Sequence, residues 1–243
     1  LKLTQTAIGY ASSCIAVSPS LGALLAEQFP VSDGKWKWIP NVVADRFSAP
    51  IESLEKQGPV KFLNLALMTE KKGQRDLIEA FVKLINGGAN AELWLAGDGP
   101  IRAELEARAE SSGVSDRVKF LGLVEPDDVP GLLGKVDVMV VSSHYETFGV
   151  VAAEALMAGL PVVATRCGGP ECIVGEGDGF LVPPRDPEAI FRAMSMVLEK
   201  MPRYDGELIA RRAKERFAGK AIAKMLTSEY ESLLNPDQLH ASS

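Results

Sequence analysis

Residues 136–165 read VDVMVVSSHYETFGVVAAEALMAGLPVVAT, and this stretch decides the fold class. Apolar residues run with little interruption over Val136–Val141 and again over Pro161–Thr165, which predicts two strands buried on both faces of a sheet. Residues 148–158, between them, are typical of a helix. A strand, a helix and a second strand in this order form the connection that joins neighbouring parallel strands.

The same alternation extends outward along the chain in both directions. Further strands are expected at residues 60–67, 91–96, 118–121 and 179–182, and further helices over 74–86, from Pro100 to about 111, and around 129–133. The apolar residues of 74–86 recur at helical spacing. The pattern predicts an α/β fold, a doubly wound parallel sheet with helices on both faces.

The two ends of the chain differ from this pattern. Residues 1–49 hold two short strands and one helix, too few for an independent fold. The stretch from Pro50 to Pro59 has the composition of a linker, and residues 187–234 predict two or three helices. We therefore expect a remnant of another domain at 1–49, the sheet domain at 50–218 and a C-terminal helix within 219–243.

The composition excludes several classes of protein. The chain has 243 residues, of which 47% are hydrophobic and 24% charged, as in ordinary globular proteins. Its net charge of −6 argues against a nucleic-acid-binding protein. No apolar stretch is long enough to span a membrane, and the start has neither Met nor a secretory signal, which predicts a fragment or a processed product. Three cysteines without a CxxC pair predict reduced thiols, a cytoplasmic location and no metal site.

The segment after the strand at 136–141 is the first candidate site, because parallel α/β sheets bind ligands where strands end and helices begin. A helix beginning near Phe148 would point unpaired N–H groups at a ligand, and Gly149 would let a phosphate approach closely. Glu146 could accept hydrogen bonds from sugar hydroxyls, and Glu154, two turns into the helix, from a ribose. Either glutamate alone is better explained as a surface carboxylate beside a helix start; the whole segment favours a site.

Three other loops follow strands. The turn Gly97-Asp98-Gly99-Pro100 could lie under a base or ribose, although a plain strand-to-helix turn explains it equally well. Lys72, before Gly73, could neutralise a diphosphate, although such a lysine is usually only solvated charge. Gly168-Gly169-Pro170-Glu171 allows close approach of a ligand to the backbone, or is simply a turn.

Jointly these motifs resemble those of glycosyltransferase family 4, the retaining enzymes of the GT-B fold. Glu146 and Glu154 match that family's pair of glutamates separated by seven residues, with Phe148-Gly149 between them. Similar runs are EALMAGLPVVAT at 154–165, GGPE at 168–171, GFLVPP at 179–184, LIEAF at 77–81, LAGDGP at 95–100, IAVS at 15–18 and IPNVV at 39–43. The resemblance covers about residues 14–200 and implies a Rossmann-like donor-binding domain preceded by the end of an N-terminal acceptor domain.

The resemblance also implies a role for each matched residue. Lys72 and Glu146 are expected to be catalytic: Glu146 would contact the donor sugar, and Lys72 would stabilise the departing diphosphate as its negative charge grows. The donor is expected to be bound by Gly97, Gly99, Phe148, Gly149, Val150 and Glu154. That donor is a nucleoside diphosphate sugar, with a UDP-sugar expected ahead of a GDP- or ADP-sugar, and neither a cofactor nor a metal is implied.

Two departures from the family pattern shape the functional hypothesis. Leu67 stands where the family usually has an arginine, and Lys71 or Arg75 could substitute for it. The N-terminal domain, which would bind a sugar, glycan or lipid-linked acceptor, is nearly all missing, and the helix near Ala221–Leu234 resembles the one that crosses back onto it. We therefore expect the chain to bind nucleotide but to be inactive in transfer as it stands, with any peripheral membrane contact made through the missing domain.

Two alternatives stay open. A non-catalytic nucleotide-sugar-binding module would be consistent with Leu67 and the missing domain, but not with the intact Glu146–Glu154 segment. The other is an epimerase or phosphorylase on the same fold. Epimerases of this kind rely on histidine and other acid–base groups, and the chain offers only His144 and His240.

Overall fold

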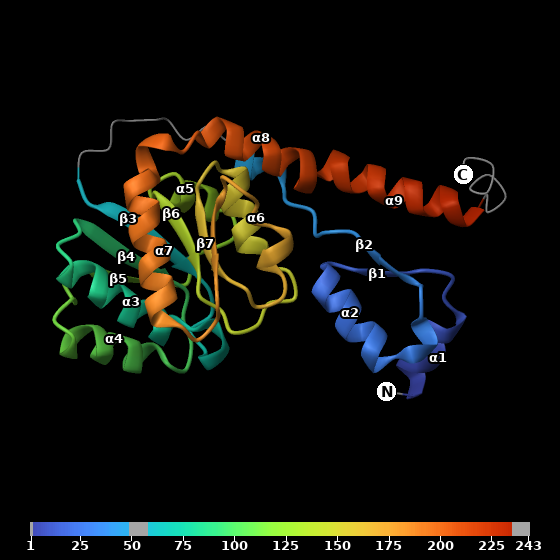
Figure 1. Cartoon of the computed structure of the whole chain (residues 1–243), viewed down its shortest axis with the longest axis horizontal. Coiled ribbons are helices and arrows are strands. Elements are labelled where there is room, and N and C mark those ends of the chain that lie inside the picture. Colours follow the sequence, from blue (N-terminus) through green and yellow to red (C-terminus); the bar gives the residue numbers. More distant parts are fainter. Residues whose placement is uncertain (1, 49–57, 235–243) are drawn as a thin grey trace.

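A six-stranded parallel sheet forms the centre of the protein, whose computed structural model describes residues 2–48 and 58–234 (Figure 1). The strands of this sheet, in spatial order, are β5 (Val118–Gly122), β4 (Ala91–Ala96), β3 (Val60–Leu65), β6 (Val138–Val141), β7 (Val162–Thr165) and β8 (Gly179–Val182). The chain builds outward from β3 to β5, crosses to β6, and then builds outward the other way. The order therefore reverses between β3 and β6, which is where ligands of doubly wound sheets bind.

Helices cover both faces of the sheet and create two separate cores. One face carries α3 (Gln74–Asn86), α4 (Arg102–Ser111) and α7 (Pro187–Lys200), and the other carries α5 (Val129–Leu133), α6 (Val150–Met157) and α8 (Gly206–Phe217). Alternate residues of one strand enter opposite cores: Val138 packs with α3 and α7, whereas Met139 packs with α6. This explains the unbroken apolar runs of the central strands, because both of their faces are buried.

A small N-terminal unit lies beside the sheet domain (Figure 1). It contains α1 (Lys2–Tyr10), α2 (Pro19–Gln28) and a parallel pair of short strands, β1 (Cys14–Ala16) and β2 (Trp36–Trp38). The long helix α9 (Gly219–Leu234) runs from the sheet domain across to this unit, where Ser13 Oγ donates a hydrogen bond to Glu229. Short 3-10 turns complete the described elements: η1 (Pro30–Ser32), η2 (Asp45–Ser48), η3 (Glu70–Lys72), η4 (Pro170–Cys172) and η5 (Met201–Arg203).

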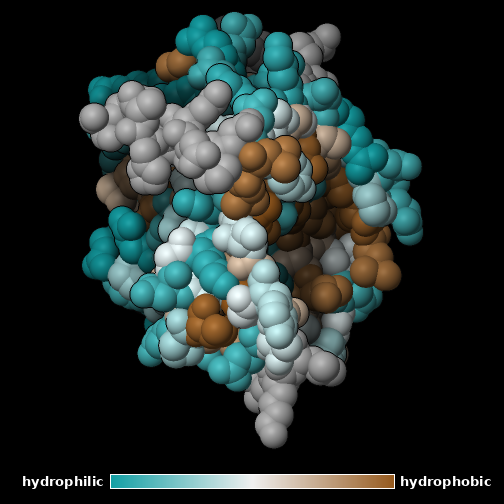
Figure 2. All heavy atoms as spheres, turned by 90° about the vertical axis from the view of Figure 1, so that its right-hand side faces the viewer, coloured by the Kyte–Doolittle hydropathy of each residue, from teal (hydrophilic) through white to brown (hydrophobic). Residues whose placement is uncertain are grey.

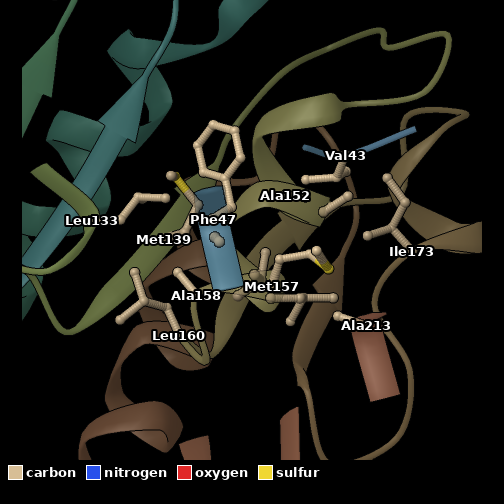
Figure 3. Packing of buried hydrophobic residues seen from close by; sticks show 14 of the residues in the cluster. Val43, Phe47, Leu133, Met139, Ala152, Met157, Ala158, Leu160, Ile173 and Ala213 are labelled. Atoms are coloured by element: carbon tan, nitrogen blue, oxygen red, sulfur yellow. The ribbon is translucent and has the colours of Figure 1, made fainter. Parts of the chain in front are cut away.

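The segment that leaves the N-terminal unit is anchored in the core of the sheet domain. Figure 3 shows Val43 and Phe47 packed in the same buried cluster as Met157 of α6 and Ile173. The backbone N–H of Val43 also donates to the carbonyl of Phe217 at 2.9 Å. Residues before the expected linker are therefore part of the sheet domain's core, while most of that linker, residues 50–57, lies outside the described residues.

The far end of the molecule exposes apolar surface. Hydrophobic residues gather around a hollow on the face formed by the N-terminal unit and the end of α9 (Figure 2). The groove between β2 and α9 has a volume of about 660 Å³, and its lining includes Trp38, Pro40 and Met225.

Across the described ranges 2–48 and 58–234, the helices are all too short or too polar to cross a membrane.

The α/β fold class with a doubly wound parallel sheet is confirmed, and the differences concern the limits of elements. The helix expected from Phe148 begins at Val150, because Gly149 adopts φ 90° and interrupts the helical conformation before it. Glu154 therefore stands little more than one turn into α6, not two. The helix expected from Pro100 begins at Arg102. Helix α1 was not expected, since its only feature in the sequence is a weak apolar pattern.

Candidate functional site

A cavity of about 340 Å³ opens at the carboxyl ends of β3 and β6, on the two sides of the point where the strand order reverses. Four segments line it: the end of β3 with its following loop, the end of β6 with its following loop, the N-terminus of α6, and Asn41 from the segment after β2. The residues that line it are Asn41, Asn64, Leu65, Ala66, Leu67, Lys72, Val140, Val141, Ser143, Glu146, Thr147, Phe148, Gly149, Val150 and Val151. Five of the predicted site residues are therefore brought together here: Lys72, Glu146, Phe148, Gly149 and Val150.

Lys72 and Glu146 form an ion pair in this lining. Lys72 Nζ lies 2.6 Å from Glu146 Oε1, and the two side chains are only 20% and 15% exposed. Ser143 Oγ donates a second hydrogen bond, of 2.7 Å, to the same carboxylate oxygen. The pair joins residues 74 positions apart in the sequence. It fixes a cation and an acceptor at the mouth of the cavity, where shielding from water strengthens the interaction of either with a ligand.

The backbone at the start of α6 forms the next part of the wall. The Phe148 ring is 2% exposed and packs edge-on against Phe217, with ring centroids 6.0 Å apart. The Phe148 ring is buried in the core and Gly149 has no side chain. Both residues can therefore contact a ligand in the cavity only through their backbone groups. The N-terminus of α6 carries the positive end of the helix dipole, which favours a phosphate.

Glu154 lies on α6 but is absent from the lining of this cavity. In the described part of the chain, its half-buried carboxylate has no hydrogen-bond partner. Burial raises the pKa of the Glu154 carboxyl above 4.5, and the nearby Arg46 lowers it in part. A carboxylate kept partly desolvated without a partner costs stability, and such groups are found more often at functional sites than in ordinary surfaces.

Replacing Glu154 with glutamine should stabilise the unliganded chain at pH 7 to 8. The folded state holds the Glu154 proton to a higher pH than the unfolded state, so stability falls as pH rises from about 4.5 through the folded pKa. Glutamine removes this cost. Thermal unfolding should show a higher Tm for Glu154→Gln at pH 8 and no difference below the ordinary glutamate pKa. The exposed Glu199, replaced in the same way, is the control. A pH-independent difference, or a less stable Glu154→Gln at pH 8, would contradict this account.

The turn that contains Gly97 and Gly99 also lies outside the lining, but it packs against residues 66–68, of which Ala66 and Leu67 line the cavity. A Cβ on Gly97 would come closer than 3.0 Å to the carbonyl oxygen of Ala66, and one on Gly99 would do the same to that of Met68. The backbone N–H of Met68 donates to the carbonyl of Asp98 at 2.8 Å. The turn therefore packs directly against the loop whose residues Ala66 and Leu67 face the cavity.

Asn64 and Ser143 are site residues that the sequence analysis did not identify. The Asn64 side chain is 4% exposed, and its Nδ2 donates to the carbonyl of Val140 at 2.9 Å, which fixes the orientation of the amide in the cavity wall. A signal was available, because Asn64 is the one polar uncharged residue in the apolar run of β3. Ser143 had no comparable signal, since its role depends on the folded position of Glu146.

Leu67 is 60% exposed in the cavity lining, so its apolar side chain occupies part of the wall without being buried. Arg75 does not take the place of the missing arginine. Its guanidinium is bound to Glu104 and Glu70, and these hydrogen bonds raise the pKa of Arg75. Lys71 is exposed but is absent from the lining. Lys72 is thus the cation that the cavity presents.

Other chemistry near the site is limited. Burial raises the pKa of the Cys167 and Cys172 thiols to about 11, so both are protonated at neutral pH and are poor nucleophiles. His144 is absent from the lining, and its ring Nε2 donates to Asp76 Oδ2 at 2.7 Å. Over residues 2–48 and 58–234, no group of three or more histidine, cysteine, aspartate or glutamate side chains is placed to hold a metal ion.

Known proteins resemble this chain in sequence and in structure. Residues 59–200 match the family described as "Glycosyl transferases group 1". The lipopolysaccharide core biosynthesis glycosyltransferase LpsE of Rhizobium meliloti is 35% identical over 176 residues, which cover 71% of this chain and 48% of LpsE. The 2-deoxystreptamine glucosyltransferase of Streptomyces kanamyceticus is 29% identical over 205 residues, 80% of this chain and 53% of that enzyme. The chain therefore spans about half the length of these curated relatives.

Among solved structures, Anabaena HepE in complex with UDP aligns with a TM-score of 0.80 and 25% identity, covering 94% of this chain and 68% of HepE. The lipopolysaccharide outer core galactosyltransferase WaaB, in its apo form, aligns with a TM-score of 0.80 and 20% identity, covering 92% of this chain and 62% of WaaB, and this likeness concerns the fold alone. The family match spans more than half of the sequence and contains Lys72, the Glu146–Glu154 segment and the whole six-stranded sheet. On this evidence the chain belongs to the group 1 glycosyl transferases.

Proposed function

We propose that this chain is the donor-binding half of a retaining glycosyltransferase that uses a nucleoside diphosphate sugar, with UDP-sugar as the favoured donor. The observation that carries the proposal is the Lys72–Glu146 ion pair, which lies beside the N-terminus of α6 in a cavity at the reversal of strand order. The reacting end of such a donor has two parts, the diphosphate and the sugar hydroxyls. The cation and the backbone N–H groups at the start of α6 match the diphosphate, and the carboxylate matches the hydroxyls.

The proposed roles follow from these positions. The diphosphate would lie against the start of α6, where the backbone of Phe148, Gly149 and Val150 and the Lys72 ammonium meet its charge. The Lys72 ammonium would then help bond cleavage, since the leaving diphosphate gains negative charge in the transition state. Glu146 would accept hydrogen bonds from the sugar. Glu154 would bind the ribose, which would give its partly buried carboxylate a partner.

The relatives support a nucleotide-sugar donor. The Anabaena HepE structure was solved with UDP, and other structures of it contain UDP-glucose, or UDP with glucose.

Retention of configuration is proposed from the Glu146–Glu154 motif. We propose that a sugar, glycan or lipid-linked acceptor binds to an N-terminal domain outside this chain, that α9 crosses back towards that domain, and that the protein works in the cytoplasm without a cofactor or metal. The chain by itself would then bind donor without efficient transfer.

One observation weighs against an epimerase. Epimerases of this kind rely on histidine as an acid–base group, and the His144 ring is hydrogen-bonded to Asp76 and does not line the cavity. His240 lies outside the described residues. A purely non-catalytic binding module remains the second candidate, favoured by Leu67 in the cavity wall.

Replacing Leu67 with arginine should tighten the binding of a nucleoside diphosphate. The exposed Leu67 side chain faces the cavity, and a guanidinium there would add charge-assisted hydrogen bonds to the phosphates, worth roughly tenfold in affinity. Titration calorimetry would measure the change with UDP, GDP and ADP. Leu234→Arg, at the exposed end of α9, adds the same charge far from the site and should leave affinity within about twofold. Equal effects of both substitutions would mean that Leu67 is not near the diphosphate.

The ribose contact provides a test of the orientation proposed for the donor. Glu154→Ala should abolish measurable nucleoside diphosphate binding, whereas Glu199→Ala, which removes an exposed carboxylate on α7, should retain it. Circular dichroism would show that both variants are folded. Unchanged binding by folded Glu154→Ala would remove the ribose assignment, and with it the orientation proposed for the donor.

A further inference from the structure

His144 makes one hydrogen bond on each side of Lys72. One is to residues 66–73, between β3 and α3, which we call the Lys72 loop, and the other is to the start of α3. Its backbone N–H donates to the carbonyl of Lys71 at 2.7 Å. Its ring Nε2 donates to Asp76 Oδ2, also at 2.7 Å, in the first turn of α3. The two side chains are about one-fifth exposed, so this hydrogen bond is largely shielded from water. One residue of the β6 loop thus holds both sides of the turn that carries Lys72.

Neighbouring contacts make this attachment tight. Ser142 Oγ donates to the carbonyl of Lys72 at 2.9 Å, so two consecutive carbonyls of the Lys72 loop are held by the segment 142–144. Gly73 packs so closely on the Ser142 carbonyl that a Cβ there would overlap it, and the His144 ring nitrogen lies 3.2 Å from that same Cβ position. The backbone of Lys72 is therefore placed by the loop that also carries Glu146.

The His144 ring lies outside the cavity, so an effect on a ligand would have to pass through Lys72. It is absent from the cavity lining, whereas Lys72 and Glu146 both belong to it. Lys72 Nζ has to be held where the diphosphate charge develops, and errors of about 1 Å in such a position can cost two orders of magnitude in rate. A residue that fixes the Lys72 backbone would therefore influence the ligand without any contact of its own.

We infer that His144 is a positioning residue, with Asp76 as its partner, which holds the Lys72 ammonium in place for the diphosphate of the donor. The inference rests on the proposed function, because it assumes that Lys72 binds that diphosphate. It gives a role to His144, which lies outside the cavity and is hydrogen-bonded to Asp76 of α3.

The test is a double-mutant cycle on the whole chain, with the tightest-binding of UDP, GDP and ADP as the probe. His144→Ala and Asp76→Ala should each weaken binding by about fivefold to tenfold. His144→Gln, whose amide can still donate to Asp76, should bind within about twofold of the unsubstituted chain. When Lys72 is already alanine, adding His144→Ala should change affinity by less than about twofold, because the group it positions is gone.

A loss of stability alone would give a different result. Ile190→Val trims a buried side chain on α7 and serves as the control for a lowered Tm, with expected binding unchanged. Binding by His144→Ala equal to that of the unsubstituted chain would overturn the inference, as would losses from His144→Ala and Lys72→Ala that simply add. Absence of binding by the unsubstituted chain to all three diphosphates would instead refute the proposed function.

Discussion

Lys72→Ala should weaken nucleoside diphosphate binding by tenfold or more and should lower sugar transfer further in any assembly that transfers. Hydrogen bonds to a charged group contribute roughly 1.5–3 kcal/mol, which corresponds to about one to two orders of magnitude. The loss has a second part, because Glu146 would then keep a carboxylate, 15% exposed, facing the diphosphate without its counter-ion. Calorimetry at two salt concentrations would measure both the affinity and the lost charge.

Glu146→Gln removes the negative charge of the same ion pair, whereas Lys72→Ala removes the positive charge. It keeps the size of the side chain and its ability to accept a hydrogen bond from Ser143, but it releases Lys72 from its ion pair. Affinity for the free diphosphate should then stay equal or rise, while contact with the donor sugar weakens. The double variant Lys72→Ala with Glu146→Gln should bind more tightly than Lys72→Ala alone. A fall in diphosphate affinity for Glu146→Gln as large as that for Lys72→Ala would contradict the assignment of the two charges.

Gly97→Ala should destabilise the protein by about 3 kcal/mol or more and remove nucleotide binding from the fraction that stays folded. Gly97 adopts φ 125°, and a Cβ would overlap the carbonyl oxygen of Ala66. Relief of that overlap requires the Ala66–Leu67 loop to move, and this loop lines the cavity. Chemical denaturation and calorimetry on the same samples would measure the two effects.

Gly88→Ala is the control for backbone conformation alone. Gly88 adopts φ 87°, and an added Cβ would have no atom within 4 Å. Its cost should be about 1–2 kcal/mol, the penalty of a left-handed conformation for alanine, with nucleotide binding unchanged. If the two substitutions cost the same, the Gly97 turn does not support the cavity wall.

The fold was predictable because its signals are local. The strand at Val138–Val141 and the strand at Val162–Thr165 are recognisable from their own composition, since each is buried on both faces. The first residue of α6 was harder to predict from the sequence. Glycine can end a loop or enter a helix, and the sequence does not show that Gly149 adopts φ 90°, outside the helical conformation.

The site was predictable only as far as residue types could indicate it. Lys72 and Gly149 were expected near a phosphate and Glu146 near the donor sugar, and the structure brings all three into one lining. The assignment of Arg75 as a substitute cation was left open by the sequence, because its partner Glu104 lies 29 positions away. The partnership of His144 with Asp76, 68 positions apart, likewise depends on how α3 docks beside the loop after β6.

The central claim is that this chain carries a donor site for a nucleoside diphosphate sugar. Titration of the chain with UDP, GDP and ADP tests it most directly. We predict one-to-one binding of at least one of them, with UDP tightest, and its loss in folded Glu154→Ala. Absence of binding by all three at concentrations up to about 1 mM, where even a contribution of roughly 4 kcal/mol would be detected, would contradict the account.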